Sequence, residues 1–298
     1  MKRTVEIILL SLLAAPFPLA ADSTIDPVDK FGYGANIGWI NFRHDQPAAP
    51  EGVVVGAAFL SGFAYSANCG WINLGDGSPG DGVAYSNASG SDFGVNHDGT
   101  GILTGLAYGA NIGWISFEQT HGKPRVDLAT GEFSGFAYSA NCGWINLGTG
   151  DLVTNSLAAG PDTDGDMIPD AWELEQGAAN GTPNNLGLLN KPGDADGDGV
   201  SDLDEYHADS NPFDASSYLR ITRLELLDTP GDNIELDWTS SDRRVYDVQK
   251  SADLVVPFAD FAGKTGIPGQ AVTTSTALTD PQTIHNFYRI EAKLPLAP

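Results

Sequence analysis

The sequence contains few basic residues for its length. Its 298 residues include 15 Lys and Arg against 39 Asp and Glu, which gives a formal net charge of −24 at pH 7. Because nucleic acids are bound through basic surfaces, this balance excludes nucleic acid as an expected partner. Hydrophobic residues still make up 41% of the chain and aromatic residues 9%, so the acidity does not imply disorder. The sequence therefore predicts folded domains.

Long apolar runs are absent beyond the N-terminus. Residues 1–21 combine Lys2 and Arg3 with a short apolar run and small residues at Ala20 and Ala21. This pattern is typical of a secretory signal peptide, whereas a retained membrane helix needs about 20 apolar residues. We therefore expect an exported protein, secreted or held at the cell surface, with no membrane insertion after signal cleavage.

Cysteine is nearly absent, and Cys69 and Cys142 are the only two in the chain. They occupy equivalent positions of an internal repeat, and exported proteins fold in an oxidising compartment. One interpretation is a disulfide between them, which requires their Cα atoms to approach within about 7 Å. The other is two separate buried thiols that replace isoleucine in a core.

Catalytic motifs are also missing. None of the five histidines belongs to a His-Glu-x-x-His pair, and the chain has no Gly-x-Ser-x-Gly elbow or phosphate-binding glycine loop. His44 and His121 follow two of the repeats at similar distances, so a metal site between them is an alternative to two surface loop histidines. A secreted hydrolase with an unrecognised site in residues 22–158 is a related alternative. We expect a protein that is not an enzyme.

The sequence does contain one motif repeated four times. It reads Gly-Tyr-Gly-Ala-Asn-Ile-Gly-Trp-Ile-Asn-Phe in residues 32–42 and recurs around Trp71, Trp114 and Trp144. Copies one and three carry Ile before the Gly-Trp step, whereas copies two and four carry Cys, which indicates tandem duplication of a two-repeat block. We therefore predict a repeat domain over residues 22–158 with pseudo-two-fold symmetry.

Each copy predicts a β-hairpin with an Ala-Asn turn in which Asn takes positive φ. If residues 67–68 form a two-residue turn, Tyr65 faces Gly70 and covers it. Residues 152–157 are a candidate strand to close the sheet. Because aromatic residues dominate β cores, we expect the repeat Tyr and Trp side chains to fill a core. The alternative is a carbohydrate-binding row of exposed aromatics, and it depends on the exposure of Trp39, Trp71, Trp114 and Trp144.

The strongest chemical signal lies in residues 159–216, which hold 14 Asp and Glu against one Lys. Crowded carboxylates repel one another unless a cation lies among them. Their spacing follows positions 1, 3, 5, 9 and 12 of a 12-residue loop that wraps a hard cation, with a backbone carbonyl at position 7. The first set is Asp162, Asp164, Asp166, Ile168 (backbone), Asp170 and Glu173, and the second is Asp194, Asp196, Asp198, Val200 (backbone), Asp202 and Glu205. Two calcium sites are therefore predicted.

A short helix is expected after each loop, so that each unit is half of an EF-hand. Pro169 suits the first position of the first helix and Gly177 suits its end. In the second unit, Ser201 and Asp204 form a variant capping box.

The two loops resemble the thrombospondin type 3-like calcium repeats of secreted bacterial proteins, which are also similar to dockerin loops. The resemblance covers about residues 160–214, including Asn211-Pro212 after the second loop. It implies calcium as the ligand and a structural spacer between extracellular modules as the role. Gly199 keeps the glycine of position 6, whereas Met167 departs from it, which predicts weaker binding in the first loop.

Residues 217–298 change in character. Short segments such as residues 234–238 alternate apolar and polar side chains between turn-forming breaks, which predicts a small β-sandwich with Ile234, Leu236 and Trp238 in its core. This stretch resembles fibronectin type III-like accessory domains of exported bacterial proteins. The N-terminal repeats likewise resemble Gly-Trp-Ile-Asn repeats of exported bacterial proteins.

The expected fold is mainly β and multidomain: a four-hairpin repeat domain, a calcium-loop linker with two short helices, and a small β-sandwich. The expected function is an exported calcium-binding modular protein with a structural or adhesive role at the cell surface or in the extracellular matrix, where calcium stiffens the joint between domains. Expected partners are calcium ions and either a surface polysaccharide or another extracellular protein. A carbohydrate-binding module is the first alternative and a secreted hydrolase the second.

Overall fold

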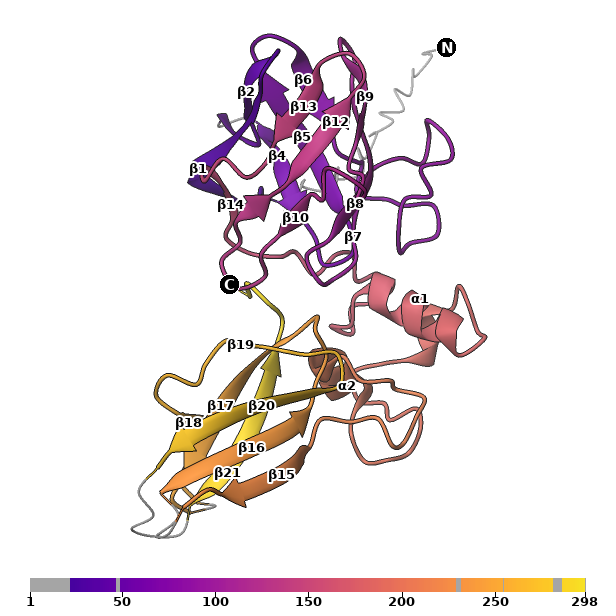
Figure 1. Cartoon of the computed structure of the whole chain (residues 1–298). Helices are drawn as coiled ribbons and strands as arrows, with labels where there is room; N and C mark the ends of the chain where they lie inside the picture. The colour runs from indigo at the N-terminus through magenta and orange to yellow at the C-terminus, as the bar shows by residue number, and fades with distance from the viewer. Residues whose placement is uncertain (1–21, 47–48, 229–231, 254, 281–285, 298) are drawn as a thin grey trace, which may run out of the picture.

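The computed structural model describes residues 22–46, 49–228, 232–253, 255–280 and 286–297. The signal peptide predicted over residues 1–21 lies outside the described residues. The fold is mainly β, as predicted. Figure 1 shows a barrel built from the N-terminal half, a second β unit from the C-terminal part, and the helices α1 and α2 beside the region where the two meet. No helix in the described part of the chain is long and apolar enough to cross a membrane.

Each copy of the repeated motif forms an antiparallel hairpin. The hairpins are β1 (Ile25–Gly34) with β2 (Gly38–Asn41), β5 (Leu60–Ser66) with β6 (Gly70–Asn73), β8 (Leu103–Gly109) with β9 (Gly113–Ser116), and β12 (Phe136–Ser139) with β13 (Gly143–Asn146). Neighbouring hairpins also pair, through β2–β5, β6–β8, β9–β12 and β13–β1. The last pairing joins the fourth hairpin to the first, so the eight strands close into a barrel (Figure 1).

Six further strands in the described part of residues 22–158 lie outside this ring, and two of them, residues 125–126 and 133–134, form a separate two-stranded sheet. The six strands are β3 (Arg43–Gln46), β4 (Ala49–Val55), β7 (Val95–His97), β10 (Arg125–Val126), β11 (Phe133–Ser134) and β14 (Leu152–Thr154). The segment 152–157, predicted to close the sheet, contributes β14, which pairs with β1. The closure of the eight-stranded ring is made by β13 instead.

The hairpin turns differ from the prediction by one residue. Tyr65 lies opposite Trp71 and not opposite Gly70, so the loop comprises residues 67–69 instead of two residues. Positive φ falls on the glycine that follows the loop, with φ of 78° at Gly70, and not on the asparagine. Glycine has no Cβ to clash in this region, which makes it the residue that takes the left-handed conformation.

The turn asparagines instead connect neighbouring hairpins. The side-chain amide of Asn68 donates to the carbonyl oxygen of Ile37 in the preceding hairpin at 3.1 Å. The same contact recurs around the barrel, where Asn36 donates to Cys142, Asn111 to Cys69 and Asn141 to Ile112. The four bonds form a closed ring at the turn end of the barrel.

In each hairpin the residues just before and at the end of the loop have complementary sizes. In the first hairpin a Cβ on Gly34 would lie 2.6 Å from Cγ1 of Ile37, so only glycine fits beside the isoleucine. In the second hairpin Ser66 and the smaller Cys69 occupy these two positions, and the Ser66 hydroxyl donates to the carbonyl oxygen of Ile37 at 3.1 Å. The third hairpin repeats the first pair and the fourth repeats the second.

The repeat tryptophans lie on the outer surface of the barrel, so the prediction that they fill a core is wrong. The exposed fractions are 54% for Trp39, 40% for Trp71, 44% for Trp114 and 43% for Trp144. The side chains that fill the interior include Ile40, Ile72, Ile115, Ile145, Ala64, Ala107 and Ala137. An eight-stranded barrel is only just wide enough to hold side chains, which favours isoleucine and alanine inside and places the indole rings outside.

Both cysteines are free and buried, so the structure contains the two-thiol arrangement and not the disulfide. Cys69 and Cys142 occupy positions that isoleucine fills in the other two hairpins. Burial raises the pKa of the Cys69 thiol, which keeps it protonated at neutral pH.

The C-terminal part forms two sheets around one core. One sheet contains β15 (Ile221–Leu226), β16 (Asn233–Thr239) and β20 (Thr273–Thr279), and the other contains β17 (Val245–Ser251), β18 (Ala259–Asp260), β19 (Ile267–Pro268) and β21 (Phe287–Lys293). Ile234, Leu236 and Trp238 are buried, as predicted, and they pack with Tyr246 and Val248 from the facing sheet.

Candidate calcium sites and the joint beside them

A helix follows each aspartate-rich loop, as predicted. The helices are α1 (Asp170–Ala179) and α2 (Asp202–Ala208), and the short 3-10 helix η1 (Leu186–Leu188) lies between them. The hydroxyl of Ser201 caps α2 by accepting the N–H of Asp204 at 3.1 Å. In α1 the prediction is wrong at both ends, because Pro169 is the N-cap and the helix continues through Gly177. A Cβ on Gly177 would lie 3.0 Å from the carbonyl oxygen of Thr182, so glycine lets the next loop fold back onto the helix.

Three carboxylates of each loop converge. Ligand oxygens of Asp162, Asp164 and Asp166 lie within 4.8 Å of one another, and the oxygens of Asp194, Asp196 and Asp198 form an equivalent group. Calcium prefers six to eight oxygen ligands at 2.3–2.6 Å, and carboxylates at alternate residues provide part of such a cage. The residues at positions 1, 3 and 5 therefore fit a calcium ion in both loops.

The first aspartate also folds the loop backbone. Asp194 accepts the N–H groups of Gly197 and Gly199 at 2.7 and 3.0 Å. Asp162 makes the same two bonds in the first loop, at 2.8 and 3.0 Å. These bonds hold the backbone in the tight turn that brings the other ligands together.

The position-9 aspartates hold the loop backbone. Both oxygens of the fully buried Asp202 accept backbone N–H groups, from Ala195 at 2.9 Å and from Asn190 at 3.0 Å. Asp170 accepts the N–H and the hydroxyl of Thr163 in the first loop. Neither belongs to the converging group of its loop, which indicates a supporting position around the ion, as in loops where position 9 acts through water.

The position-12 glutamates are buried without enough hydrogen-bond donors. Glu173 is 1% exposed, and neither of its oxygens finds a donor within the described part of the chain. Glu205 is fully buried, and one oxygen accepts the Ser210 hydroxyl at 3.1 Å while the other has no donor among the described residues. Burying a carboxylate without a partner is costly. A cation beside these oxygens would supply the missing partner, although neither glutamate belongs to the converging group of its loop.

The raised pKa values of the two glutamates also favour a cation beside them. Burial, and after it the neighbouring Asp164 and Asp166, raises the pKa of Glu173 to about 8. Burial is also the main cause that raises the pKa of Glu205 to about 7, with Asp196 and Asp198 adding to the effect. Each glutamate thus lies in the field of its own aspartates, where a divalent cation would stabilise the ionised form.

The backbone at position 6 is left-handed in both loops, with φ of 81° at Met167 and 95° at Gly199. A side chain in this region costs about 1–2 kcal/mol, which the first loop bears and the second avoids. The structure thus supplies a physical reason for the expected difference in affinity between the loops. The carbonyl groups of Ile168 and Val200 stay predicted ligands.

We expect Met167→Gly to stabilise the protein by up to about 1 kcal/mol and to tighten calcium binding in the first loop. The gain is the relieved strain less the greater chain entropy that glycine loses on folding, about 0.5–1 kcal/mol. Urea unfolding and calorimetric titration measure the two effects. Gly199→Ala is the matched opposite change, since a Cβ there meets nothing within 4 Å and costs only backbone strain. Equal stability of the parent, Met167→Gly and Gly199→Ala would contradict this account.

Two consecutive backbone amides connect the loops. The N–H of Asn190 donates to Asp202 at 3.0 Å, and the N–H of Lys191 donates to Asp166 at 3.1 Å. A small core is shared as well, and it contains Ile168, Trp172, Leu189 and Tyr206. Both loops and both helices therefore form one packed unit.

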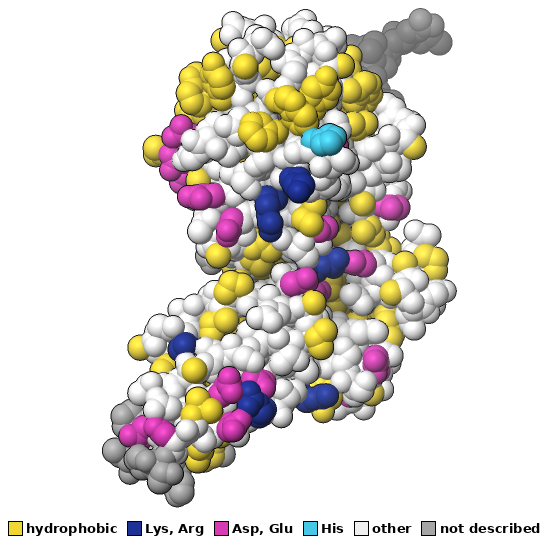
Figure 2. Space-filling model, viewed as in Figure 1, with side chains coloured by type: hydrophobic (Ala, Val, Ile, Leu, Met, Phe, Trp, Pro, Cys, Tyr) yellow, Lys and Arg dark blue, Asp and Glu magenta, His cyan; other side chains and the backbone are white. Residues whose placement is uncertain are grey.

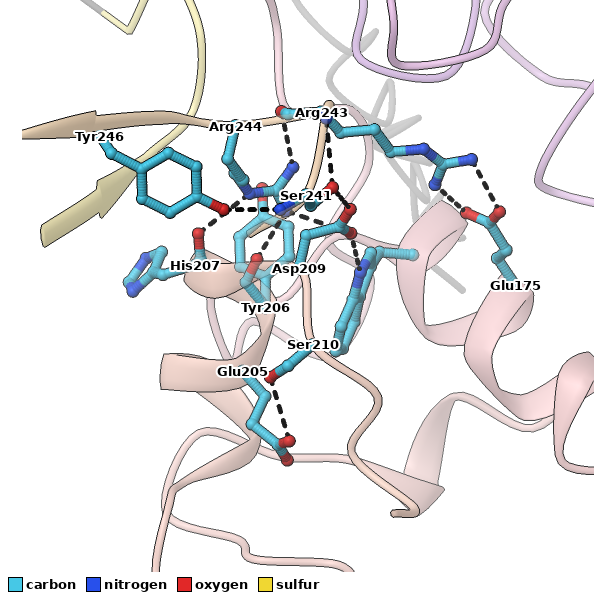
Figure 3. Close-up of polar contacts among 11 residues, drawn as sticks. Glu175, Glu205, Tyr206, His207, Asp209, Ser210, Ser241, Arg243, Arg244 and Tyr246 are labelled. Carbon is cyan, nitrogen blue, oxygen red and sulfur yellow. Dashed lines mark hydrogen bonds and ion pairs between the residues drawn. The ribbon is translucent and has the colours of Figure 1, made fainter. Parts of the chain in front are cut away.

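This unit is fixed to the C-terminal sheets through Asp209, which ends α2 in the left-handed conformation (Figure 3). The Asp209 carboxylate accepts the indole N–H of Trp172 at 3.1 Å and the hydroxyl of Ser241 at 2.5 Å. Arg244, which is 5% exposed, lies 3.6 Å from it and donates to the carbonyl oxygens of Tyr206 and His207. Arg244 thereby caps the C-terminal end of α2.

A second arginine, Arg243, contacts both α1 and the barrel. Arg243 donates to both carboxylate oxygens of Glu175 in α1, at 2.8 and 3.0 Å (Figure 3). Its side chain also packs on Gly99 of the barrel, where a Cβ would lie 2.9 Å from the arginine Cδ. The local sequence around residue 243 does not indicate these contacts, because the partner Glu175 lies 68 residues away in the chain.

A third cluster of carboxylates, which the sequence did not predict, already has a basic partner. Oxygens of Asp247, Asp260 and Glu291 converge in the C-terminal sheets. The ammonium group of Lys293 lies 2.5 Å from Asp247, and the amide of Gln249 donates to the other two carboxylates. The group therefore differs from the calcium loops, where buried oxygens have no donor among the described residues.

The histidine pair considered as a metal site does not form one. His44 packs its ring 5.6 Å from that of Trp71, His121 is exposed, and no metal-ligating group among the described residues contains either.

No family model matches the chain, and neither does any curated protein or solved structure. The functional assignment accordingly rests on the geometry of the two loops and of the joint.

Proposed function

We propose that this chain is an exported, calcium-binding modular protein with a structural or adhesive role at the cell surface or in the extracellular matrix. Its modules would be a repeat domain over residues 22–158, a calcium segment over 159–216 and a β-sandwich over 217–298, after removal of residues 1–21. The observation that supports calcium best is the pair of buried glutamates, each beside three converging aspartates and each with an oxygen that has no donor among the described residues.

Calcium would stiffen the joint through α1 and α2. Glu173 and Trp172 are neighbours in α1, so the helix that supplies a ligand also supplies the indole bonded to Asp209. Glu175, two residues after Glu173 in α1, pairs with Arg243. At ten times its dissociation constant, one ion adds about 1.4 kcal/mol and two add about 3 kcal/mol. This amount orders a joint but does not fold a domain.

We propose a non-catalytic role. Among the described carboxylates, those whose pKa is raised to about 7 or 8 are the calcium-loop glutamates. The buried His97 has a structural environment, because its Nδ1 bonds the Gly56 carbonyl at 2.8 Å and its Nε2 accepts the N–H of Gly101 at 3.0 Å. Burial lowers the pKa of this histidine, which keeps the ring neutral.

Calorimetric titration of the mature chain tests the proposal. We expect two calcium ions per chain and a melting temperature that rises by about 2–4 °C for each kcal/mol of binding. Magnesium at equal concentration serves as the control and should bind more weakly, because it demands near-octahedral geometry and dehydrates reluctantly. Absence of both heat and thermal shift at millimolar calcium would rule the proposal out.

A further inference from the structure

Aromatic side chains form an exposed band around the hairpin end of the barrel. In each hairpin a tyrosine lies opposite the tryptophan, with ring centroids 4.9–5.0 Å apart. Figure 2 shows hydrophobic side chains gathered over this end of the molecule. We define the aromatic band as Tyr33, Trp39, Tyr65, Trp71, Tyr108, Trp114, Tyr138 and Trp144, of which all but the half-buried Tyr65 are exposed.

The band is rigid. Each tyrosine packs against its tryptophan with ring planes tilted by 58–66°, an arrangement that favours both rings. The rings stand on strands that are paired on both sides in the closed barrel. A ligand bound here would therefore not have to order the side chains that it contacts, which removes one of the main costs of binding.

The segments that carry the band contain no charge. Residues 31–42, 60–75, 102–117 and 133–150 include no Asp, Glu, Lys, Arg or His, although 18% of the whole chain is charged. A site for phosphate or carboxylate groups carries Arg or Lys, and a site for a cation carries carboxylates. The segments of the band hold neither, and the histidine ring that contacts Tyr65 and Trp71, His44, adds no carboxylate, Arg or Lys, so the band suits an uncharged ligand.

Hydrogen-bonding side chains lie between the aromatic pairs. At three seams between hairpins an asparagine is opposite a tyrosine of the neighbouring hairpin, and at the fourth seam a serine takes its place. These pairs are Asn41 with Tyr65, Asn73 with Tyr108, Asn146 with Tyr33, and Ser116 with Tyr138. Each asparagine oxygen accepts a backbone N–H two residues further on, which fixes the amide and its NH2 donor group.

We infer that the aromatic band binds an uncharged polysaccharide. Sugar rings offer apolar C–H faces that stack on indole and phenol rings, and their hydroxyl groups pair with fixed amides. The band repeats one Trp-Tyr-amide unit four times, so a polymer that also repeats its unit can engage two neighbouring sites at once and gain avidity. An anionic membrane surface fits poorly, because it recruits proteins through Lys and Arg.

A second copy of the chain fits less well than a glycan. Two molecules that each carry a net charge of −24 repel one another, and the band offers no opposite charges to offset this. Amides between the rings also divide the apolar surface into small parts, whereas stable dimers bury a continuous apolar core. The inference stands beside the calcium proposal and does not rest on it.

Retention of the full mature chain on polysaccharides tests the inference. The uncharged probes are cellulose, chitin and a soluble β-glucan, and the anionic control is alginate. We expect retention on at least one uncharged probe, little on alginate, and a loss of about tenfold or more in affinity when Trp39 and Trp114 are both replaced by alanine. Trp114→Tyr should keep most of the affinity, because it keeps a ring.

The control variant is Val28→Ala, which changes an apolar side chain 74% exposed on β1 of the same barrel, outside the uncharged segments. It should bind like the parent, and circular dichroism should show the same fold in all variants. Retention should persist in a chelator, whereas the calcium proposal predicts the thermal shift to disappear there, so the two failures are separable. Absence of retention on every uncharged probe, retention unchanged by the double substitution, or a dimer that this substitution dissociates would each overturn the inference.

Discussion

Glu173→Gln is expected to lower calcium affinity in the first loop by at least 100-fold and, above pH 8, to stabilise the calcium-free protein. Loss of a group that merely supports a metal ligand costs about 10–100-fold, so loss of the ligand charge itself costs more. The same change removes repulsion from four nearby aspartates, Asp162, Asp164, Asp166 and Asp170. Calorimetry should report one ion per chain in place of two.

Glu175→Gln is the matched control, because it alters the same side chain two residues away in α1. Glu175 pairs with Arg243 and not with the aspartates of the loop, so the number of bound ions should stay at two. If the two variants bind calcium alike, Glu173 is not a ligand.

Calcium affinity and the stability of the calcium-free protein should both depend on pH, because the two glutamates titrate near neutral pH. The pKa of Glu173 is about 8 and that of Glu205 about 7, both raised from 4.5, so the folded calcium-free protein binds more protons than the unfolded chain between pH 4.5 and about 8. The stability that these protons provide is complete below pH 4.5 and is lost as pH rises through that window. Calcium binding requires the ionised carboxylates, so affinity should rise with pH and level off above about 8.

Calorimetry in buffers of different ionisation enthalpy counts these protons. At pH 6.5 we expect calcium to displace protons from the parent protein, and Glu173→Gln should release fewer. Above pH 9 the count should approach zero in both. A count of zero at pH 6.5 would show that the glutamates are already ionised.

Arg244→Ala is expected to lower the free energy of unfolding by about 3–5 kcal/mol. The arginine is 5% exposed, so its removal leaves Asp209, whose side chain is 9% exposed, without its cation and takes the guanidinium donor from two carbonyl oxygens at the end of α2. Urea unfolding in saturating calcium measures the loss. The free energy of unfolding of Arg244→Lys should lie between that of the parent and that of Arg244→Ala, since lysine keeps the charge but not the planar guanidinium group.

Arg220→Ala provides the control for this change. Arg220 is an exposed arginine of the same part of the chain and stacks on Tyr218, so its loss should cost no more than about 1 kcal/mol. Similar unfolding curves for the Arg220 and Arg244 variants would show that the joint adds nothing to stability.

Short-range patterns predicted the fold best. The Ser201 cap and the four hairpins depend on residues a few positions apart, and the structure contains them. Of the aspartate spacing, the structure brings together positions 1, 3 and 5 of each loop, whereas calcium binding stays a prediction. The length of the hairpin loop was harder to predict from the sequence, because positive φ lies at Gly70 instead of Asn68 and this shifts the strand register by one residue.

The orientation of the strands and the joint depend on long-range geometry. Alternation along β6 assigns Trp71 and Ile72 to opposite faces but does not say which face turns inward, and barrel curvature decides in favour of the smaller side chain. The joint depends on contacts such as Ser241 with Asp209, 32 residues apart, which leave no local trace. The buried environment of Glu173 is equally a property of the folded chain.

The pairing of β13 with β1 also affects how the molecule behaves among its neighbours. A sheet with two ends offers unpaired edge strands with which the strands of another chain can pair. Here the eight hairpin strands present no such edge, and the asparagine amides fasten the last hairpin to the first. The ring of hairpins therefore gives the strands of another chain no free edge with which to pair.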